Sequence, residues 1–214
     1  MQTSMRVGAL LAIALTLLPP LYGDADILFS AHMMQHLLLI AAAAPLLAAS
    51  STFDAFAKTR AGRTLLEPAS SWLVFVGIFL IWHWPTAFQW AAKQEWSRLL
   101  ELASILIAAC LFWTTALSSE NPGRISQGAR ALFVMTAAVV TDLPGVIMLF
   151  APRAICVMPG ENAPAFGITP LEDQQIAGLL MWVPANLVFF AIATWLFAQW
   201  ISEDGIVPSK GKHT

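Results

Sequence analysis

Two histidines, His32 and His36, stand four residues apart at the start of a long apolar run. Residues at this spacing lie on one face of a helix, one turn from each other. Two imidazoles on one face can bind the same metal ion. Met33, Met34 and Gln35 lie between them, and methionine thioethers favour Cu(I). The stretch therefore predicts one wall of a metal site, with copper as the preferred ion.

Packing alone would also account for part of this pattern. Methionine commonly fills gaps in apolar interiors, so packing is the favoured interpretation of Met33 and Met34. Imidazoles inside a membrane span are costly and usually functional, so a functional role is favoured for His32 and His36. The alternative is that both histidines form hydrogen bonds to Gln35 and to a neighbouring helix.

The composition of the chain is that of a membrane protein. Of its 214 residues, 58% are hydrophobic and only 11% are charged, and its mean hydropathy is +0.70. A soluble domain carries roughly 25% charged residues, so this chain cannot cover itself with a polar surface. The net charge of −2 gives no argument for a nucleic-acid partner. Cys110 and Cys156 form no CxxC motif and allow one disulfide at most.

Six apolar stretches predict an all-α, polytopic transmembrane helix bundle that forms a single domain. The stretches are residues 7–21, 27–49, 71–90, 99–117, 131–151 and 176–201. About 20 residues cross a bilayer as a helix, and all stretches but the first meet that length. The first resembles a signal peptide, but no small-x-small cleavage site follows, so we expect it to be retained. Asp26 is expected to cap the second stretch.

The distribution of lysine and arginine predicts that both termini are cytoplasmic. One set of connections holds eight of these residues: Arg6, Lys58, Arg60, Arg63, Arg124, Arg130, Lys210 and Lys212. The other set holds three: Lys93, Arg98 and Arg153. Because cytoplasmic loops carry the excess of positive charge, the second set is expected to face outward. The histidine pair then lies at the outer mouth of its helix.

This topology brings further metal-binding side chains to a similar depth. His83 ends the third stretch, and Met181 begins the sixth, so both are expected on the outer side with Met148, Cys156 and Met158. His83 has an alternative role in a belt of tryptophans at the membrane interface. For the three methionines, a structural role is the favoured interpretation. His213 falls in the cytoplasmic tail, and no role is assigned to it.

Asp142 lies in the middle of the fifth stretch, where an ionisable side chain inside the membrane costs free energy. Pro144 follows it and is expected to kink the helix and free backbone carbonyl groups. At this depth Asp142 is predicted to stay protonated, to pair with another group or to line a polar cavity, and it could orient a histidine through a hydrogen bond. The alternative is a local bond to the freed backbone. Glu101 and Asn186 are expected to make polar contacts between helices. Cys110 is expected to be an inert apolar residue.

Several segments resemble those of the CtaG-type cytochrome c oxidase assembly factors, a family of multi-span bacterial membrane proteins. The segments are HMMQHLLL at 32–39, APLL at 44–47, WHWP at 82–85, FW at 112–113, DQQIAG at 173–178 and MWVP at 181–184. The first two segments, taken together, and the last two, taken together, are the specific ones. Many relatives have seven spans, and many have a histidine where this chain has Leu102, which implies that a ligand set including it would differ here.

The resemblance implies a role in maturing haem-copper oxidases in the bacterial inner membrane, at the step of copper delivery. It implies that His32, His36 and His83 are functional, with Asp173, Gln174 and Met181 as further positions.

We therefore expect a non-enzymatic assembly factor that binds Cu(I) transiently at an outward-facing His/Met site. It would pass the ion to an oxidase subunit in the same membrane, with a periplasmic copper chaperone as a possible donor, and homo-oligomers are allowed. The first alternative is a haem protein that uses the same histidines. Since His32 and His36 share one helix face, that alternative needs His83 opposite one of them. A second alternative is a proton or ion pathway through Asp142 and the histidines.

Overall fold

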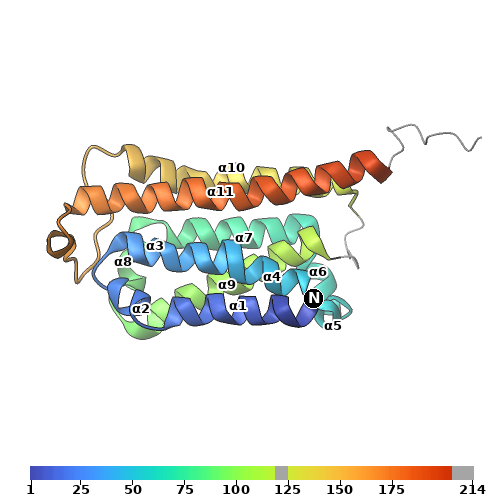
Figure 1. Cartoon of the computed structure of the whole chain (residues 1–214), viewed down its shortest axis with the longest axis horizontal. Coiled ribbons are helices and arrows are strands. Elements are labelled where there is room, and N and C mark those ends of the chain that lie inside the picture. Colours follow the sequence, from blue (N-terminus) through green and yellow to red (C-terminus); the bar gives the residue numbers. More distant parts are fainter. Residues whose placement is uncertain (119–124, 204–214) are drawn as a thin grey trace, which may run out of the picture.

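The computed structural model describes residues 1–118 and 125–203 of the chain. These two ranges form helices and connecting segments and contain no strand, which confirms the all-helical fold class. The long helices run side by side (Figure 1). Of the residues discussed above, Arg124, Lys210, Lys212 and His213 lie outside the described ranges.

The helices follow the apolar stretches of the sequence. In chain order they are α1 (Gln2–Leu17), α2 (Leu21–Asp24), α3 (Phe29–Leu37), the π-helix η1 (Leu38–Ala43), α4 (Ala44–Ala49), α5 (Asp54–Ala57), α6 (Arg60–Leu65), α7 (Pro68–Trp82), α8 (Pro85–Ala91), α9 (Glu95–Leu117), α10 (Gln127–Phe150), the 3₁₀-helix η2 (Ala163–Phe166) and α11 (Pro170–Glu203). Helices α3, η1 and α4 form one continuous helical segment.

Four helical segments are long and apolar enough to cross a membrane. They are Phe29–Ala49, Glu95–Leu117, Gln127–Phe150 and Pro170–Ser202. Helices α7 and α8 together make a fifth, bent by 77° at their junction. Helix α1 is apolar but has only 16 residues. The six predicted stretches thus all become helices, and length and composition identify four or five of them as spans.

The third stretch is not the single helix that was predicted. It breaks after Trp82, and Trp84 takes an extended conformation with φ −76° and ψ 131°. Proline disfavours helical geometry in the residue before it, so Pro85 ends one helix and begins the next. The fifth stretch forms the single helix α10, which contains Pro144, the residue at which a kink was expected.

Helices α10 and α11 pack along each other, and α3 and α7 lie between this pair and α1 in Figure 1. A close approach of backbones joins the pair, because a Cβ atom on Gly178 would lie 2.6 Å from the carbonyl oxygen of Gly145. The interior is aromatic, with Phe112 stacked on Phe75 at 4.6 Å between ring centroids. Trp113 is fully buried beside them.

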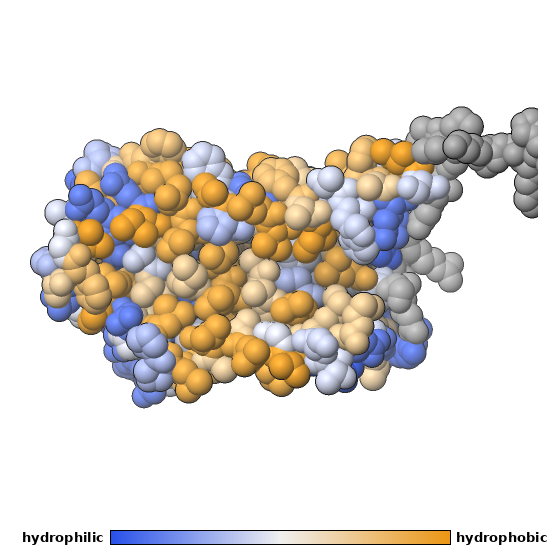
Figure 2. All heavy atoms as spheres, in the orientation of Figure 1, coloured by the Kyte–Doolittle hydropathy of each residue, from blue (hydrophilic) through white to orange (hydrophobic). Residues whose placement is uncertain are grey.

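The sides of the bundle expose apolar side chains. Leu10, Leu73, Ile107, Leu132 and Leu187 are each more than 60% exposed. Figure 2 shows this apolar surface along the middle of the molecule, with hydrophilic residues gathered towards its two ends. An apolar band between polar ends is the surface that a bilayer covers.

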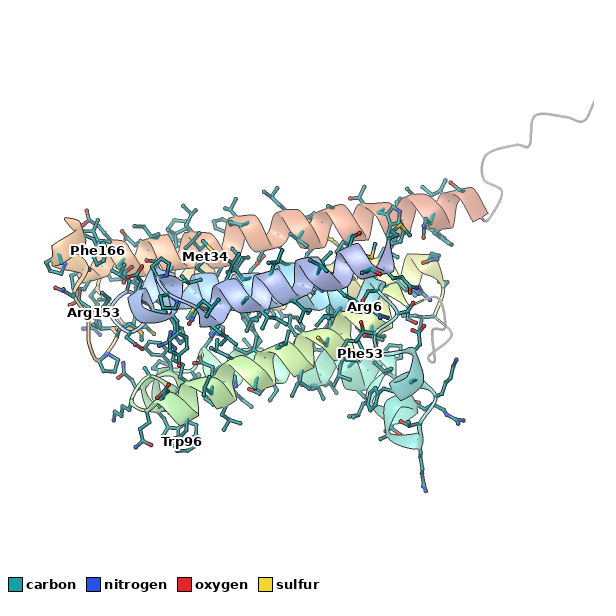
Figure 3. All side chains as sticks on the ribbon, turned by 60° about the horizontal axis from the view of Figure 1, so that its bottom comes forward. Arg6, Met34, Phe53, Trp96, Arg153 and Phe166 are labelled. Carbon is teal, nitrogen blue, oxygen red and sulfur yellow. The ribbon has the colours of Figure 1, made fainter. Side chains whose placement is uncertain are left out.

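The two ends of the bundle carry different residues. Figure 3 shows Arg6 and Phe53 at one end, and Trp96, Arg153 and Phe166 at the other. We name these the Arg6 end and the Arg153 end. The histidine-bearing helix α3 begins at the Arg153 end, together with α2 and α8 (Figure 1).

Candidate metal centre

His32, His36 and Glu101 meet inside the bundle. Nε2 of His32 lies 3.3 Å from Oε1 of Glu101, and Nε2 of His36 lies 3.4 Å from the same oxygen. The two imidazole rings are 4.7 Å apart, so the pair shares a helix face as its spacing predicts. One ligand atom from each of the three residues lies within 4.8 Å of the others, and all three residues are buried.

These three side chains leave several of one another's hydrogen-bonding atoms without a partner. Only His32 forms a hydrogen bond with the carboxylate. Within the described part of the chain, Nε2 of His36, Nδ1 of both histidines and Oε2 of Glu101 have no hydrogen-bond partner. Buried polar atoms without partners are costly, and such clusters are expected where a ligand binds. Two imidazole nitrogens and a carboxylate oxygen directed at one point fit a borderline cation such as copper or zinc.

His83 adds a third imidazole from the break between α7 and α8. Its Nδ1 lies 2.7 Å from the carbonyl oxygen of Phe79. A carbonyl only accepts hydrogen bonds, so Nδ1 carries the proton and Nε2 keeps its lone pair. This Nε2 atom is buried and has no partner among the described residues. The ring centroid of His83 is 5.5 Å from that of His36.

A small cavity of about 30 Å³ joins the imidazoles to two sulfur atoms. Met33, His36, His83 and Met181 are among its lining residues, and they come from α3, the α7–α8 break and α11. A space of this size holds one or two water-sized groups. We name these four residues the soft donor set, because two thioethers lie beside two imidazoles. Met34 is half-buried and does not line the cavity.

The sequence of residues 2–203 matches the family described as cytochrome c oxidase caa3 assembly factor (Caa3_CtaG). The chain belongs to this family. The match spans nearly the whole chain and includes every residue of the metal centre, and it confirms the resemblance read from the motifs. No curated protein and no solved structure matches the chain.

In this Caa3_CtaG protein, Asp173 positions the helix that carries the histidine pair. Its carboxylate accepts hydrogen bonds from the backbone N–H groups of Phe29 at 2.6 Å and Ser30 at 3.1 Å, and from the Ser30 hydroxyl. These are free N–H groups of the first turn of α3, so α11 caps a helix more than 140 residues away. Asp26, which was expected to be the cap, forms an ion pair with Arg98 instead.

Gln35 faces away from the imidazoles and ties α3 to two other helices. Its amide donates to the carbonyl oxygen of Thr16 at 2.6 Å, and its Oε1 accepts from Arg98 at 3.0 Å. Arg98 also donates to the carbonyl oxygen of Tyr22 at 2.8 Å. Because Arg98 stands one helical turn before Glu101, these bonds fix the part of α9 that presents the carboxylate.

Gln174 holds the segment that follows α10. Its Oε1 accepts from the backbone N–H groups of Ile155 and Cys156, the latter at 2.9 Å. Its Nε2 donates to the carbonyl oxygen of Met148 at 3.0 Å. Burial raises the pKa of the Cys156 thiol, so the thiol is protonated when no ion binds it.

Asp142 pairs with another polar group, which was one of the alternatives predicted for it, and that group is Asn186. Its carboxylate accepts a hydrogen bond from Asn186 at 2.8 Å and so joins α10 to α11. Neither a histidine nor the backbone near Pro144 is its hydrogen-bond partner among the described residues. The inter-helix role that was expected of Asn186 is thereby found.

Sequence reasoning missed Glu101 and Arg98 as parts of the centre. Glu101 was expected only as a polar contact, and Arg98 as a loop charge. The available signal was that two ionisable residues stand one turn apart on a long apolar helix, where such residues are costly. Leu102, which follows Glu101 on α9, packs with Ala12, Leu39 and Ala43 in a cluster separate from the metal centre.

The helix changes form directly after the histidine pair. The π-helix η1 begins at Leu38, and Trp113 donates from Nε1 to the carbonyl oxygen of Ile40 at 2.7 Å. Turns of π-helix are frequent at functional sites, and their wider winding displaces carbonyl groups from the regular pattern. The indole thus binds a carbonyl group in the widened segment and joins it to α9.

Proposed function

We propose that this protein is a non-enzymatic assembly factor that binds copper as cargo at His32, His36 and Glu101. It assists delivery of the ion to a haem-copper oxidase. The observation that carries the proposal is the convergence of two imidazole nitrogens on one buried carboxylate oxygen. The family membership supplies the oxidase as the recipient.

The soft donor set supports copper over other ions. Zinc is satisfied by imidazole and carboxylate ligands, whereas thioethers favour Cu(I). Met33 and Met181 line the same cavity as His36, so two thioether side chains share a cavity with one of the proposed imidazole ligands. A site that holds its ion with a small number of protein ligands of mixed type allows the ligand exchange that a delivery factor needs.

We infer that the Arg153 end faces outward from a bacterial inner membrane. Among the described residues, five basic side chains belong to the Arg6 end: Arg6, Lys58, Arg60, Arg63 and Arg130. Three belong to the other: Lys93, Arg98 and Arg153. Cytoplasmic ends carry the excess of positive charge. In this orientation a periplasmic copper chaperone reaches the end where α3 begins, and an oxidase subunit lies alongside in the membrane.

The alternatives have less support. Haem would need His83 and His36 on opposite faces of a macrocycle, but the cavity between them has a volume of only about 30 Å³. A proton or ion pathway would need Asp142 near the histidines. Its hydrogen bond is to Asn186, and no other polar contact of Asp142 occurs in the described ranges.

The test is the copper content of the oxidase in cells grown at limiting copper. A strain that lacks this gene is complemented with the wild type, with His32→Ala/His36→Ala or with Glu95→Gln, which alters an exposed residue of α9. We expect the double variant to leave the oxidase as copper-poor as the deletion does, and the control to restore it. Unchanged oxidase copper in the deletion strain would contradict the delivery role.

A further inference from the structure

A second cavity lies on the other side of His83. It has a volume of about 460 Å³ and lies between the α7–α8 break, α10 and the segment after α10. His83, Trp84 and Pro85 line it from the break, and Met148 and Cys156 line it from the opposite wall. Ile147, also in its lining, is 60% exposed, so the cavity opens on the side of the bundle. We name it the lateral groove.

His83 lines both the lateral groove and the small cavity of the soft donor set. Its ring therefore stands between the buried metal centre and the opening. Phe79 fixes the proton on Nδ1, and Nε2 is left with a lone pair and no partner among the described residues. A neutral imidazole in this state is competent to bind a metal ion without losing a proton.

The sulfur atoms that line the lateral groove belong to Met148 and Cys156, and hydrogen bonds fix the backbone of both residues. Met148 and Cys156 are 4% and 6% exposed. The side chain of Gln174 binds the backbone of both, at 3.0 Å and 2.9 Å, and so keeps the end of α10 beside the following segment. Gly145, one turn before Met148, is held against Gly178. The two sulfur residues are thus held on one wall of the groove, facing the residues of the break.

We propose that His83, Met148 and Cys156 form an exchange position, through which Cu(I) passes between the buried metal centre and the lateral groove. This proposal rests on the proposed function, because it requires copper at His32, His36 and Glu101. The two cavities share His83, and sulfur-containing residues line both of them.

The transfer is a series of ligand exchanges at constant oxidation state. The ion leaves the carboxylate and imidazoles for His83 and the thioethers of Met33 and Met181, and then for the sulfur atoms of Met148 and Cys156. The thiol of Cys156 releases its proton to water when the sulfur binds, and takes one back when the ion departs. No electron moves, because Cu(I) accepts both imidazole and sulfur ligands without a change of oxidation state.

The experiment measures how fast loaded protein gives Cu(I) to a chelator. Full-length protein in detergent is loaded with one equivalent of Cu(I) and mixed with bicinchoninate in a stopped-flow instrument, and its Cu(I) affinity is measured at equilibrium. We expect Met148→Leu/Cys156→Ser to slow the transfer at least tenfold while the affinity stays within twofold of the wild type. Met135→Leu/Cys110→Ser, which changes the same residue types outside the groove, should match the wild type.

Equal transfer rates in the groove variant and the wild type would overturn the exchange position and leave the proposed function intact. A wild type that binds no Cu(I) would overturn both. Cys156→Ser alone preserves size and should slow transfer severalfold, so the proposal remains falsifiable if the double variant fails to fold. A normal rate in Cys156→Ser together with a normal rate in Met148→Leu also overturns it.

Discussion

Glu101 turns the histidine pair into a binding site. A carboxylate inside a membrane span is costly unless a partner compensates it. The two imidazoles provide only one hydrogen bond to it, from His32. Its second oxygen has no partner among the described residues. A bound cation would compensate the carboxylate and use the lone pairs of both imidazoles.

Glu101→Gln is expected to weaken Cu(I) binding about 10–100-fold, because hydrogen bonds and contacts of a charged group contribute about 1.5–3 kcal/mol. The amide keeps the size of the side chain and removes its charge. The measurement is a competition titration of purified protein against a chromophoric Cu(I) chelator.

Glu95→Gln, an exposed change on the same helix, is the matched control and should bind as the wild type does. Equal affinity in the Glu101→Gln variant would show that the carboxylate is not a ligand.

At the scale of helices, the centre depends on contacts between segments far apart in the chain. Helix α11 caps α3 through Asp173, and α9 binds α3 and the α2 region through Arg98. Helices α10 and α11 approach closely at Gly145 and Gly178. Each contact orients one wall of the metal centre. A substitution at each contact therefore tests separately how that wall is positioned.

Removal of the inter-helix cap should loosen α3. Asp173→Ala deletes three hydrogen bonds to the first turn, and loss of a cap typically costs about 1–2 kcal/mol. We expect a lower melting temperature in detergent and weaker Cu(I) binding. Glu172→Ala removes the neighbouring exposed carboxylate. That carboxylate accepts a hydrogen bond from the backbone N–H of Thr169, just before its own helix α11, and not from α3. A melting temperature for Asp173→Ala as high as that of Glu172→Ala would contradict the capping role.

The approach of α10 and α11 leaves no space for a methyl group at Gly178. An added Cβ would lie 2.6 Å from the Gly145 carbonyl oxygen and 2.8 Å from the Leu149 nitrogen. We expect Gly178→Ala to lower the free energy of unfolding by about 1–3 kcal/mol, as overpacking does.

The matched control is Gly77→Ala on α7, where an added Cβ meets nothing within 4 Å. Alanine is the better helix former by about 1 kcal/mol, so this variant should be as stable as the wild type or more so. Thermal unfolding in detergent separates the two, and equal stability of both variants would show that the contact at Gly178 is not tight.

At the scale of the whole molecule, the apolar runs were enough to predict the helices, because backbone groups in lipid must be satisfied within a helix. The spacing of His32 and His36 predicted their shared face, because residues four apart in a helix lie one turn from each other. The partner of that face was not predictable, because Glu101 lies 69 residues from His32 and reaches it only through packing. The partner of Asp142 was not predictable either, because Asn186 lies 44 residues away on another helix. The break before Pro85 was predictable from the proline itself, but the continuous apolar run around it favoured the prediction of a single helix.

The most direct test of the account is the copper content and absorption spectrum of the purified, full-length protein. After reconstitution with Cu(I) and removal of loosely bound metal, the wild type should hold about one copper ion per chain, as expected of a centre with imidazole and carboxylate ligands. The His32→Ala/His36→Ala variant should hold none. Copper retained by the double variant would contradict the site, and a strong Soret band that is lost on His83→Ala would contradict copper as the cargo.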